Sequence, residues 1–201
     1  MRNLAPKTRT RFKTSTEYKK LKQEQDLFRR RIRFVALLTS KLKENDVDAI
    51  LVGGQAIDLY TGGTFATSDI DLLVTNKTVT EKLLNKFGFG KEGGVWFNRD
   101  LNIVIQVITT PYSGDLSRLK KVRVKDFELR VAAPEDLIIG RLYSSKVLNS
   151  NPQLDLEQAV TLLNLFAESI DNAYLDEQAK KNDVEDILTE ARRCALKIRN
   201  R

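Results

Sequence analysis

The sequence predicts an α+β (mixed α/β) fold, in which a small mixed β-sheet has flanking helices and is followed by a helical C-terminal region. Three observations support this prediction. The 201 residues are enough for a medium-sized domain with its own core. The composition, 41% hydrophobic and 30% charged, is that of a folded globular chain. Strand and helix patterns alternate after an initial helix, and the last third contains helix patterns alone.

The chain is expected to begin with a flexible basic tail and one long helix. Residues 1–15 combine Pro6 with threonines and basic side chains, which is typical of a mobile tail. A helix is expected over 16–44, where apolar residues recur at helical spacing and Glu44-Asn45-Asp46 ends the pattern. These apolar residues are Phe28, Ile32, Val35, Leu38 and Leu42.

The remaining elements follow from turn signals and periodicity. The Thr78-x-x-Glu81 capping box predicts a helix over 78–87, and Pro134 suits the first turn of another. The expected strands are 47–52, 69–74, 95–97, 101–108, 122–124 and 127–131, with hairpins around 98–100 and 125–126. The expected further helices are 55–60, 134–148, 151–170 and 175–198. We therefore divide the chain into a tail (1–15), a core with a leading basic helix (16–132) and a helical region (133–201).

The residue types that are absent narrow the chemistry. The chain has no histidine, so a Ser-His-Asp triad, a Cys-His pair and a His-ligated zinc site are excluded. Its one cysteine, Cys194, excludes intrachain disulfides and cysteine-cluster metal sites. Carboxylates, Lys and Arg, hydroxyls, backbone amides and a metal that prefers oxygen ligands remain.

The positive charge is concentrated at the N-terminus. Residues 1–35 hold twelve of the 34 basic residues and three of the 27 acidic ones, a net charge of +9. The rest of the chain, with 22 basic and 24 acidic residues, carries −2. Such an arm attracts RNA or another polyanion, although a solvated helix face gives the same pattern. We expect deletion of this arm to abolish polyanion binding and to leave Asp69 and Asp71 in place.

The sequence predicts no contact with membranes. No apolar stretch approaches the ~18 residues that span a bilayer, and the basic N-terminus lacks the apolar segment of a signal peptide. The free Cys194 is consistent with a reducing compartment. We therefore expect a cytoplasmic protein, and the sequence leaves its oligomeric state open.

The segment from 50 to 74 carries the chemistry. Gly53-Gly54, between an expected strand and a helix, lets the backbone approach a ligand, and a helix N-terminus suits phosphate. Asp69 and Asp71 are two apart on a strand, so both side chains leave the same face. Two adjacent carboxylates are tolerated when a divalent cation lies between them or when they face solvent. A carboxylate pair with a phosphate cradle is the equipment for metal-assisted phosphoryl transfer.

This segment resembles the signature of the DNA polymerase beta-like nucleotidyltransferase superfamily. Gly53-Gly54-x-Ala56 followed by Thr67-x-Asp69-Ile70-Asp71 is most similar to a small prokaryotic branch. That branch includes uncharacterised nucleotidyltransferase-like proteins and toxin components of abortive-infection systems. Weaker similarity extends over about 47–190, through Glu135-Asp136-Leu137-Ile138 with Arg141, and through Asp155-Leu156-Glu157-Gln158-Ala159.

The resemblance implies a role for individual residues. Asp69 and Asp71 would bind Mg²⁺ or Mn²⁺. The nucleoside triphosphate would contact Gly53, Gly54, Thr67, Ser68 and Arg141, although Arg141 is equally consistent with an exposed helix charge. The implied reaction moves a nucleoside monophosphate from the triphosphate to a hydroxyl on RNA, protein or a small molecule.

Departures from the family pattern keep a second interpretation open. The family's third carboxylate is replaced by Gln106, which offers an oxygen but is no base. We include Gln106 among the candidate catalytic residues for its position. The branch's usual arginine before the threonine is replaced by Phe65, and an arginine near Asp155 is missing. The alternatives are a catalytically inactive fold that binds nucleotide or nucleic acid, in a toxin–antitoxin setting for example, and a structural adaptor.

Overall fold

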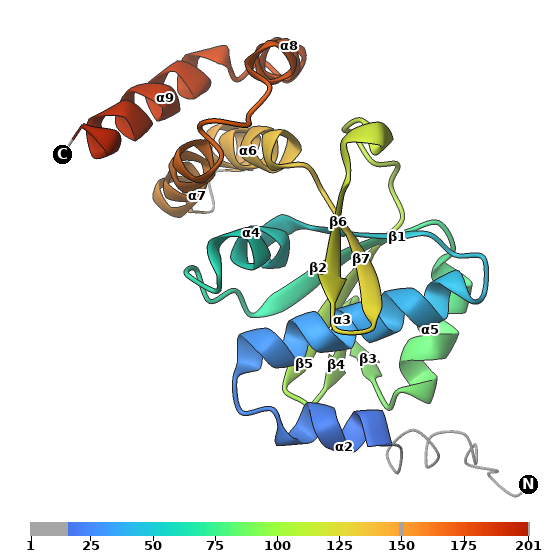
Figure 1. Ribbon diagram of the computed structural model, residues 1–201. Helices are drawn as coiled ribbons and strands as arrows, with labels where there is room; N and C mark the ends of the chain where they lie inside the picture. The colour runs from blue at the N-terminus through green and yellow to red at the C-terminus, as the bar shows by residue number, and fades with distance from the viewer. Residues whose placement is uncertain (1–15, 149–150, 201) are drawn as a thin grey trace, which may run out of the picture. The chain divides into compact units, whose positions relative to one another are not determined.

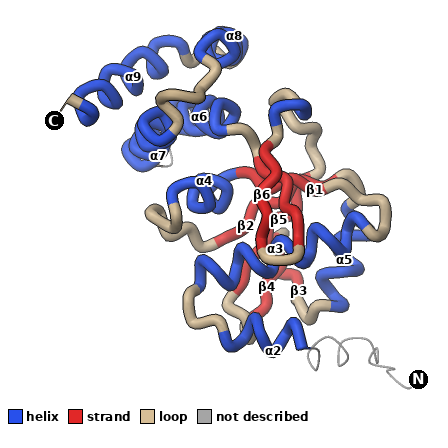
Figure 2. The backbone as a smooth tube through the Cα atoms, viewed as in Figure 1, coloured by secondary structure: helices blue, strands red, loops and turns tan. Residues whose placement is uncertain are grey.

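A computed structural model describes residues 16–148 and 151–200, and the predicted tail over 1–15 lies outside them. The mixed α/β prediction is confirmed. Seven strands form one sheet in the order β3-β4-β5-β2-β1-β7-β6, drawn in red in Figure 2. Strand β2 pairs parallel with β5 and β1 with β7, whereas β4 pairs antiparallel with β3 and β5. No helix of the described residues is long and apolar enough to cross a membrane.

The strands lie close to their predicted positions, with one addition. The bounds are β1 Ala49–Val52, β2 Asp69–Val74, β3 Gly90–Glu92, β4 Val95–Asn98, β5 Ile103–Ile108, β6 Lys120–Val124 and β7 Phe127–Val131. The added strand is β3, whose glycine-rich sequence between Gly88 and Gly94 is typical of a loop. Gly93 and Gly94, both at positive φ, instead form the turn that pairs β3 with β4.

The prediction of one long N-terminal helix over 16–44 is wrong in one respect, because the helix is interrupted between Gln23 and Leu27. Helix α2 covers Thr16–Gln23 and helix α3 covers Leu27–Lys43. Asp26 begins α3 by accepting a hydrogen bond from the backbone N–H of Arg29 at 3.1 Å. The spacing of the apolar residues gives no sign of this interruption. The sequence signal for it is Asp26, an N-cap residue that hydrophobic spacing does not reveal.

Capping residues also correct the other helix boundaries. Helix α4 covers Gly53–Thr61 and helix α5 covers Lys77–Lys86. Asn76, rather than the predicted Thr78, caps α5 by accepting from the N–H of Val79 at 3.1 Å. Asparagine at this position places a side-chain oxygen over the first turn, so the capping box that begins at Thr78 is not used.

The C-terminal helices are shorter and more numerous than predicted. The bounds are α6 Pro134–Tyr143, continued by a wider turn over Ser144–Leu148, α7 Pro152–Leu165, α8 Asn172–Lys181 and α9 Glu185–Arg199. The single helix predicted over 175–198 is wrong, because the chain turns between α8 and α9. Asp183 adopts φ 55° at that turn, a conformation that no helix interior accommodates.

The described chain forms two compact units, each assembled from several segments. The first comprises the sheet with α2, α3 and α5, and the second comprises α4, α6–α9 and the 112–120 segment. In the first unit α3 contacts both β7 and α5, and it is drawn in blue over the strands in Figure 1. Phe34 of α3 packs against Phe87 and Phe89 in this core. In the second unit Tyr60 packs edge-on against Phe166.

Candidate functional site

The central parallel pair β2–β5 holds three of the predicted site residues. Ile70, Leu72 and Val74 are buried, whereas Asp69 and Asp71 lie half-buried on the opposite face of β2. In the parallel register Asp71 lies opposite Gln106 of β5. Residues opposite each other in a pleated sheet project to the same face, so the two aspartates and Gln106 share one surface.

The two hydroxyl residues before β2 contact the first aspartate. The Thr67 and Ser68 hydroxyls lie 3.5 and 3.4 Å from Oδ1 of Asp69. These distances exceed those of strong O–H···O bonds, which are about 2.7 Å. Neutral and distant donors such as these compensate a carboxylate charge weakly, so Asp69 retains capacity for a stronger partner.

The donors on this face fit a hard divalent cation. Two carboxylates and an amide oxygen are ligand types that Mg²⁺ and Mn²⁺ accept, and Mg²⁺ keeps several waters beside one or two carboxylates. Over 16–148 and 151–200, no group of three or more His, Cys, Asp or Glu residues could hold a metal. This face offers two carboxylates, and the residue opposite Asp71 is neutral because position 106 is glutamine.

The predicted triphosphate turn has the local geometry that phosphate binding needs. Helix α4 begins directly after β1, and Gly53 adopts φ 64°, which disfavours a side chain. Val52 at the N-cap supplies no side-chain acceptor to the first-turn N–H groups. The residue after the glycine pair, Gln55, was not among the residues predicted from the sequence. It is completely buried, and its amide oxygen and nitrogen both lack a partner among the described residues.

Arg141 lies in the second unit and is engaged there. Its guanidinium donates to Oδ1 of Asp155 at 3.0 Å, and the Ser144 hydroxyl donates to Oδ2 at 2.7 Å. Asp155 is buried, so this ion pair neutralises a charge between α6 and α7. The phosphate contact predicted for Arg141 stays a prediction, and in the structure Arg141 is paired with Asp155.

The Glu135-Asp136 motif is also engaged within the second unit. Asp136 accepts from the hydroxyls of Tyr112 at 2.6 Å and Tyr174 at 2.7 Å. Burial, reinforced by these hydrogen bonds, raises the pKa of both tyrosines above the ordinary range. Glu135 accepts from the backbone N–H of Asp171 at 3.0 Å and pairs with Arg118. The motif thus fastens the 112–120 segment and the start of α8 onto α6.

Residues 16–35 of the basic N-terminal segment contribute to the first unit's core, which corrects the expectation that deletion of residues 1–35 would leave Asp69 and Asp71 in place. Tyr18 and Leu21 of α2 are buried, and the Tyr18 hydroxyl donates to Asp100 at 2.9 Å. Arg30 donates to the carbonyl of Leu101 at 2.9 Å. Deletion would remove these contacts together with residues 27–35 of helix α3, so the unit that carries Asp69 and Asp71 would be destabilised.

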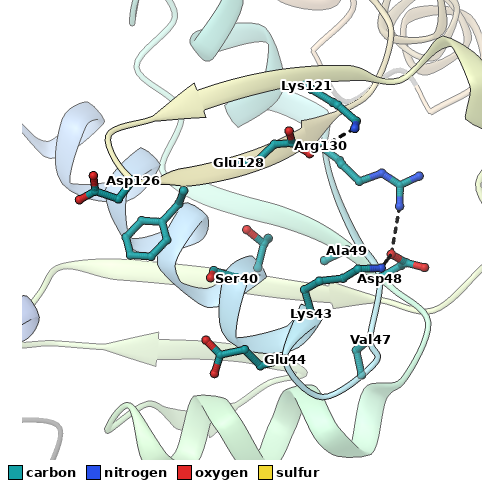
Figure 3. A pocket seen from close by; sticks show the side chains of 12 residues that line it. Ser40, Lys43, Glu44, Val47, Asp48, Ala49, Lys121, Asp126, Glu128 and Arg130 are labelled. Atoms are coloured by element: carbon teal, nitrogen blue, oxygen red, sulfur yellow. Dashed lines mark hydrogen bonds and ion pairs between the residues drawn. The ribbon is translucent and has the colours of Figure 1, made fainter.

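A pocket of about 650 Å³ lies elsewhere in the first unit, between the C-terminal half of α3, the start of β1 and the β6–β7 hairpin. Lys43 and Arg130 each form an ion pair with Asp48 at 3.1 Å, and dashed lines mark both pairs in Figure 3. Lys121 pairs with Glu128 across the hairpin at 3.5 Å. Each basic side chain that lines this pocket pairs with an acidic side chain that also lines it, and none of the predicted site residues lines the pocket.

Comparisons with known proteins agree with this fold. The model of a family described as "Nucleotidyltransferase of unknown function (DUF6036)" matches residues 31–199. A search of curated proteins found no match. The crystal structure of an antigenic nucleotidyltransferase-like protein from Paracoccidioides brasiliensis is similar, with a TM-score of 0.56 and 17% identity over 83% of this chain and 92% of that one.

A second solved structure has the same fold. The solution structure of the antibiotic-resistance factor ANT(2'')-Ia, described as showing substrate-regulated conformation dynamics, is similar with a TM-score of 0.50. The two chains are 15% identical over 84% of this chain and 96% of that one. At these identities the structural likeness establishes the fold.

Proposed function

Because the chain belongs to the DUF6036 family of nucleotidyltransferases, we propose that it is a metal-dependent nucleotidyltransferase that uses a nucleoside triphosphate. The observation that carries the proposal is the shared face of Asp69, Asp71 and Gln106 on the β2–β5 pair. Two carboxylates on one strand repel each other, and a divalent cation between them removes that repulsion. Mg²⁺ or Mn²⁺ held there would neutralise charge on the triphosphate during transfer.

In the proposed reaction the acceptor hydroxyl oxygen forms a bond to the α-phosphorus. The bond between that phosphorus and the oxygen bridging to the β-phosphate breaks, and pyrophosphate leaves. The hydroxyl proton passes to solvent, because Gln106 cannot take it. Gly53 and Gly54 would present backbone N–H groups to the triphosphate, with Thr67 and Ser68 as hydroxyl donors. The acceptor is RNA, a protein or a small molecule.

The test incubates the protein with labelled triphosphates, Mg²⁺ or Mn²⁺ and candidate acceptors such as tRNA. We expect Asp69→Ala and Asp71→Ala to lower transfer about 10³-fold, equivalent to ~4 kcal/mol of barrier. Asp48→Asn is the matched control, because it removes a carboxylate of the same unit that is paired with Lys43 and Arg130. Transfer that persists undiminished in the double Asp69→Ala/Asp71→Ala protein would contradict the proposal.

The neutral residue at position 106 favours a second candidate, an inactive fold that binds nucleotide without turnover. Gln106 lies opposite Asp71, where a third carboxylate would complete the ligand set. In this case calorimetry detects binding of the triphosphate and no product forms. The Gln106→Asp variant separates the two candidates. A rise in transfer identifies a weakened enzyme, and binding that persists without transfer identifies a binding protein.

Binding of RNA or another polyanion to residues 1–35 is part of the proposal. Within the described part of this segment, Lys19, Lys20 and Lys22 are exposed on α2. Changing these three lysines to glutamine keeps the buried Tyr18 and Leu21, so it replaces the deletion as the experiment of choice. We expect weaker RNA retention in a mobility-shift assay and a smaller dependence of affinity on salt. If the affinity for RNA and its dependence on salt were unchanged, these three lysines would be excluded as RNA contacts.

A further inference from the structure

Four arginines in the first turns of α3 have different partners within the first unit. Arg29 pairs with Asp26, and Arg33 pairs with Glu24. Arg30 donates to the carbonyl oxygens of Glu24 and Leu101, each at 2.9 Å. These three hold α3 against neighbouring loops. Arg31 differs, because its Nη1 donates to the carbonyl oxygen of Thr67.

Thr67 leads directly into the strand that carries the two aspartates. Its hydroxyl and that of Ser68 contact Oδ1 of Asp69. The residue before it, Ala66, adopts φ 48°, which is unfavourable for any residue with a Cβ atom. A chain that enters a strand through such a turn needs external contacts to stay in place. The guanidinium of Arg31 is one such contact, and it comes from an element 36 residues away.

An arginine suits this position for physical reasons. The guanidinium is planar, carries its charge at every physiological pH and loses little of it on partial burial. Arg31 is half-buried in α3, a helix anchored in the core by Phe34, Val35 and Leu38. The donor is therefore held on a rigid element and its acceptor on the segment that aims Asp69.

We propose that Arg31 is a positioning residue for the Asp69–Asp71 pair. It fixes the Thr67 carbonyl and so sets the direction in which the Thr67–Asp69 segment presents its oxygen atoms to a divalent cation. Residues that orient metal ligands from outside the ligand set typically change metal affinity by about 10- to 100-fold when removed. This inference rests on the proposed function for the metal, whereas the contact to Thr67 does not.

The experiment compares Arg31→Ala with Arg30→Ala, a matched control that also loses a guanidinium bound to a backbone carbonyl. Hydrogen exchange is measured first, without metal. We expect Arg31→Ala to accelerate exchange at residues 67–69 and Arg30→Ala to accelerate it at 99–102. Equal exchange at 67–69 in wild type and Arg31→Ala would overturn the inference, whatever the function of the protein.

Calorimetric titration with Mn²⁺ gives the second readout. We expect Arg31→Ala to weaken Mn²⁺ binding about tenfold, Arg31→Lys to restore part of it, and Arg30→Ala to leave it unchanged. Unchanged or tighter Mn²⁺ binding in Arg31→Ala would overturn the positioning role. Mn²⁺ binding that is equal in wild type and Asp69→Asn/Asp71→Asn would instead contradict the proposed function, and the exchange result for Arg31 would stand by itself.

Discussion

Asp69 of the sheet and the aspartates of the helical unit have the same chemistry and different surroundings. Asp136 accepts two tyrosine hydroxyls at 2.6 and 2.7 Å, and Asp155 accepts an arginine and a serine at 3.0 and 2.7 Å. Asp69 instead meets two hydroxyls of its own segment at 3.4 and 3.5 Å. Short bonds to distant parts of the chain identify carboxylates that stabilise the fold. Asp69, whose contacts are long and come from adjacent residues of the sequence, has carboxylate oxygens that are free to accept a stronger donor or a cation.

Exchanging one carboxylate of each kind for its amide is the strongest test of this difference. Asp155→Asn leaves the half-buried Arg141 without its counter-charge and should lower the free energy of unfolding by about 3 kcal/mol. Asp69→Asn removes a charge from a like-charged pair and should leave that free energy nearly unchanged. Urea denaturation measures both. A large stability loss in Asp69→Asn would place that residue among the structural aspartates.

The contact between Gly114 and Asp136 allows a second test of the helical unit. A Cβ atom at position 114 would lie 2.2 Å from Oδ2 of Asp136, so Gly114→Ala must displace the carboxylate from its tyrosines. We expect a loss of about 2 kcal/mol in the free energy of unfolding. Gly140→Ala is the control, because nothing lies within 4 Å of its added Cβ and alanine favours the helix. Equal effects of the two changes would contradict the tight packing.

Two buried amides extend the comparison to neutral groups. Asn98 uses both ends of its side chain, with Phe87 as acceptor at 3.2 Å and Leu101 as donor at 3.1 Å. Gln55 uses neither. Because a buried polar group without partners is destabilising, Gln55→Met should raise the free energy of unfolding by about 1 kcal/mol, whereas Asn98→Leu should lower it. Thermal denaturation of both variants decides, and a loss of stability in Gln55→Met would reveal a hidden partner.

The smallest expected effect on stability concerns Tyr18, whose hydroxyl group links α2 to Asp100. Tyr18→Phe removes the hydrogen bond to Asp100 and should cost about 1 kcal/mol near neutral pH. Burial, followed by the bond to Asp100, raises the pKa of Tyr18 to about 12. A raised pKa means that the folded state favours the neutral phenol, so the stabilisation is complete below pH 10 and is lost as the pH rises toward 12. The difference between wild type and Tyr18→Phe should shrink over that range, and a constant difference would exclude titration of Tyr18.

Local patterns predicted most of the elements and missed several of their ends. The apolar run of β2 and the proline that starts α6 were visible in the sequence. Asp26 and Asn76 decide where α3 and α5 begin, and they were overlooked because the periodicity runs past them. A capping side chain sets the start of a helix through a single hydrogen bond to a first-turn N–H group. The spacing of apolar residues does not depend on that bond and so does not reveal it.

The sequence by itself determined the type of fold, the exclusion of histidine-based and cysteine-cluster chemistry, and the placement of Asp69 and Asp71 on one face of a strand. These follow from composition and from short-range geometry, since alternate residues of a strand share a face. Only the tertiary structure decided that Gln106 lies opposite Asp71, that Arg31 reaches Thr67 and that Asp155 neutralises Arg141. Strand register and contacts between distant segments depend on how the whole chain packs, and no local pattern encodes them.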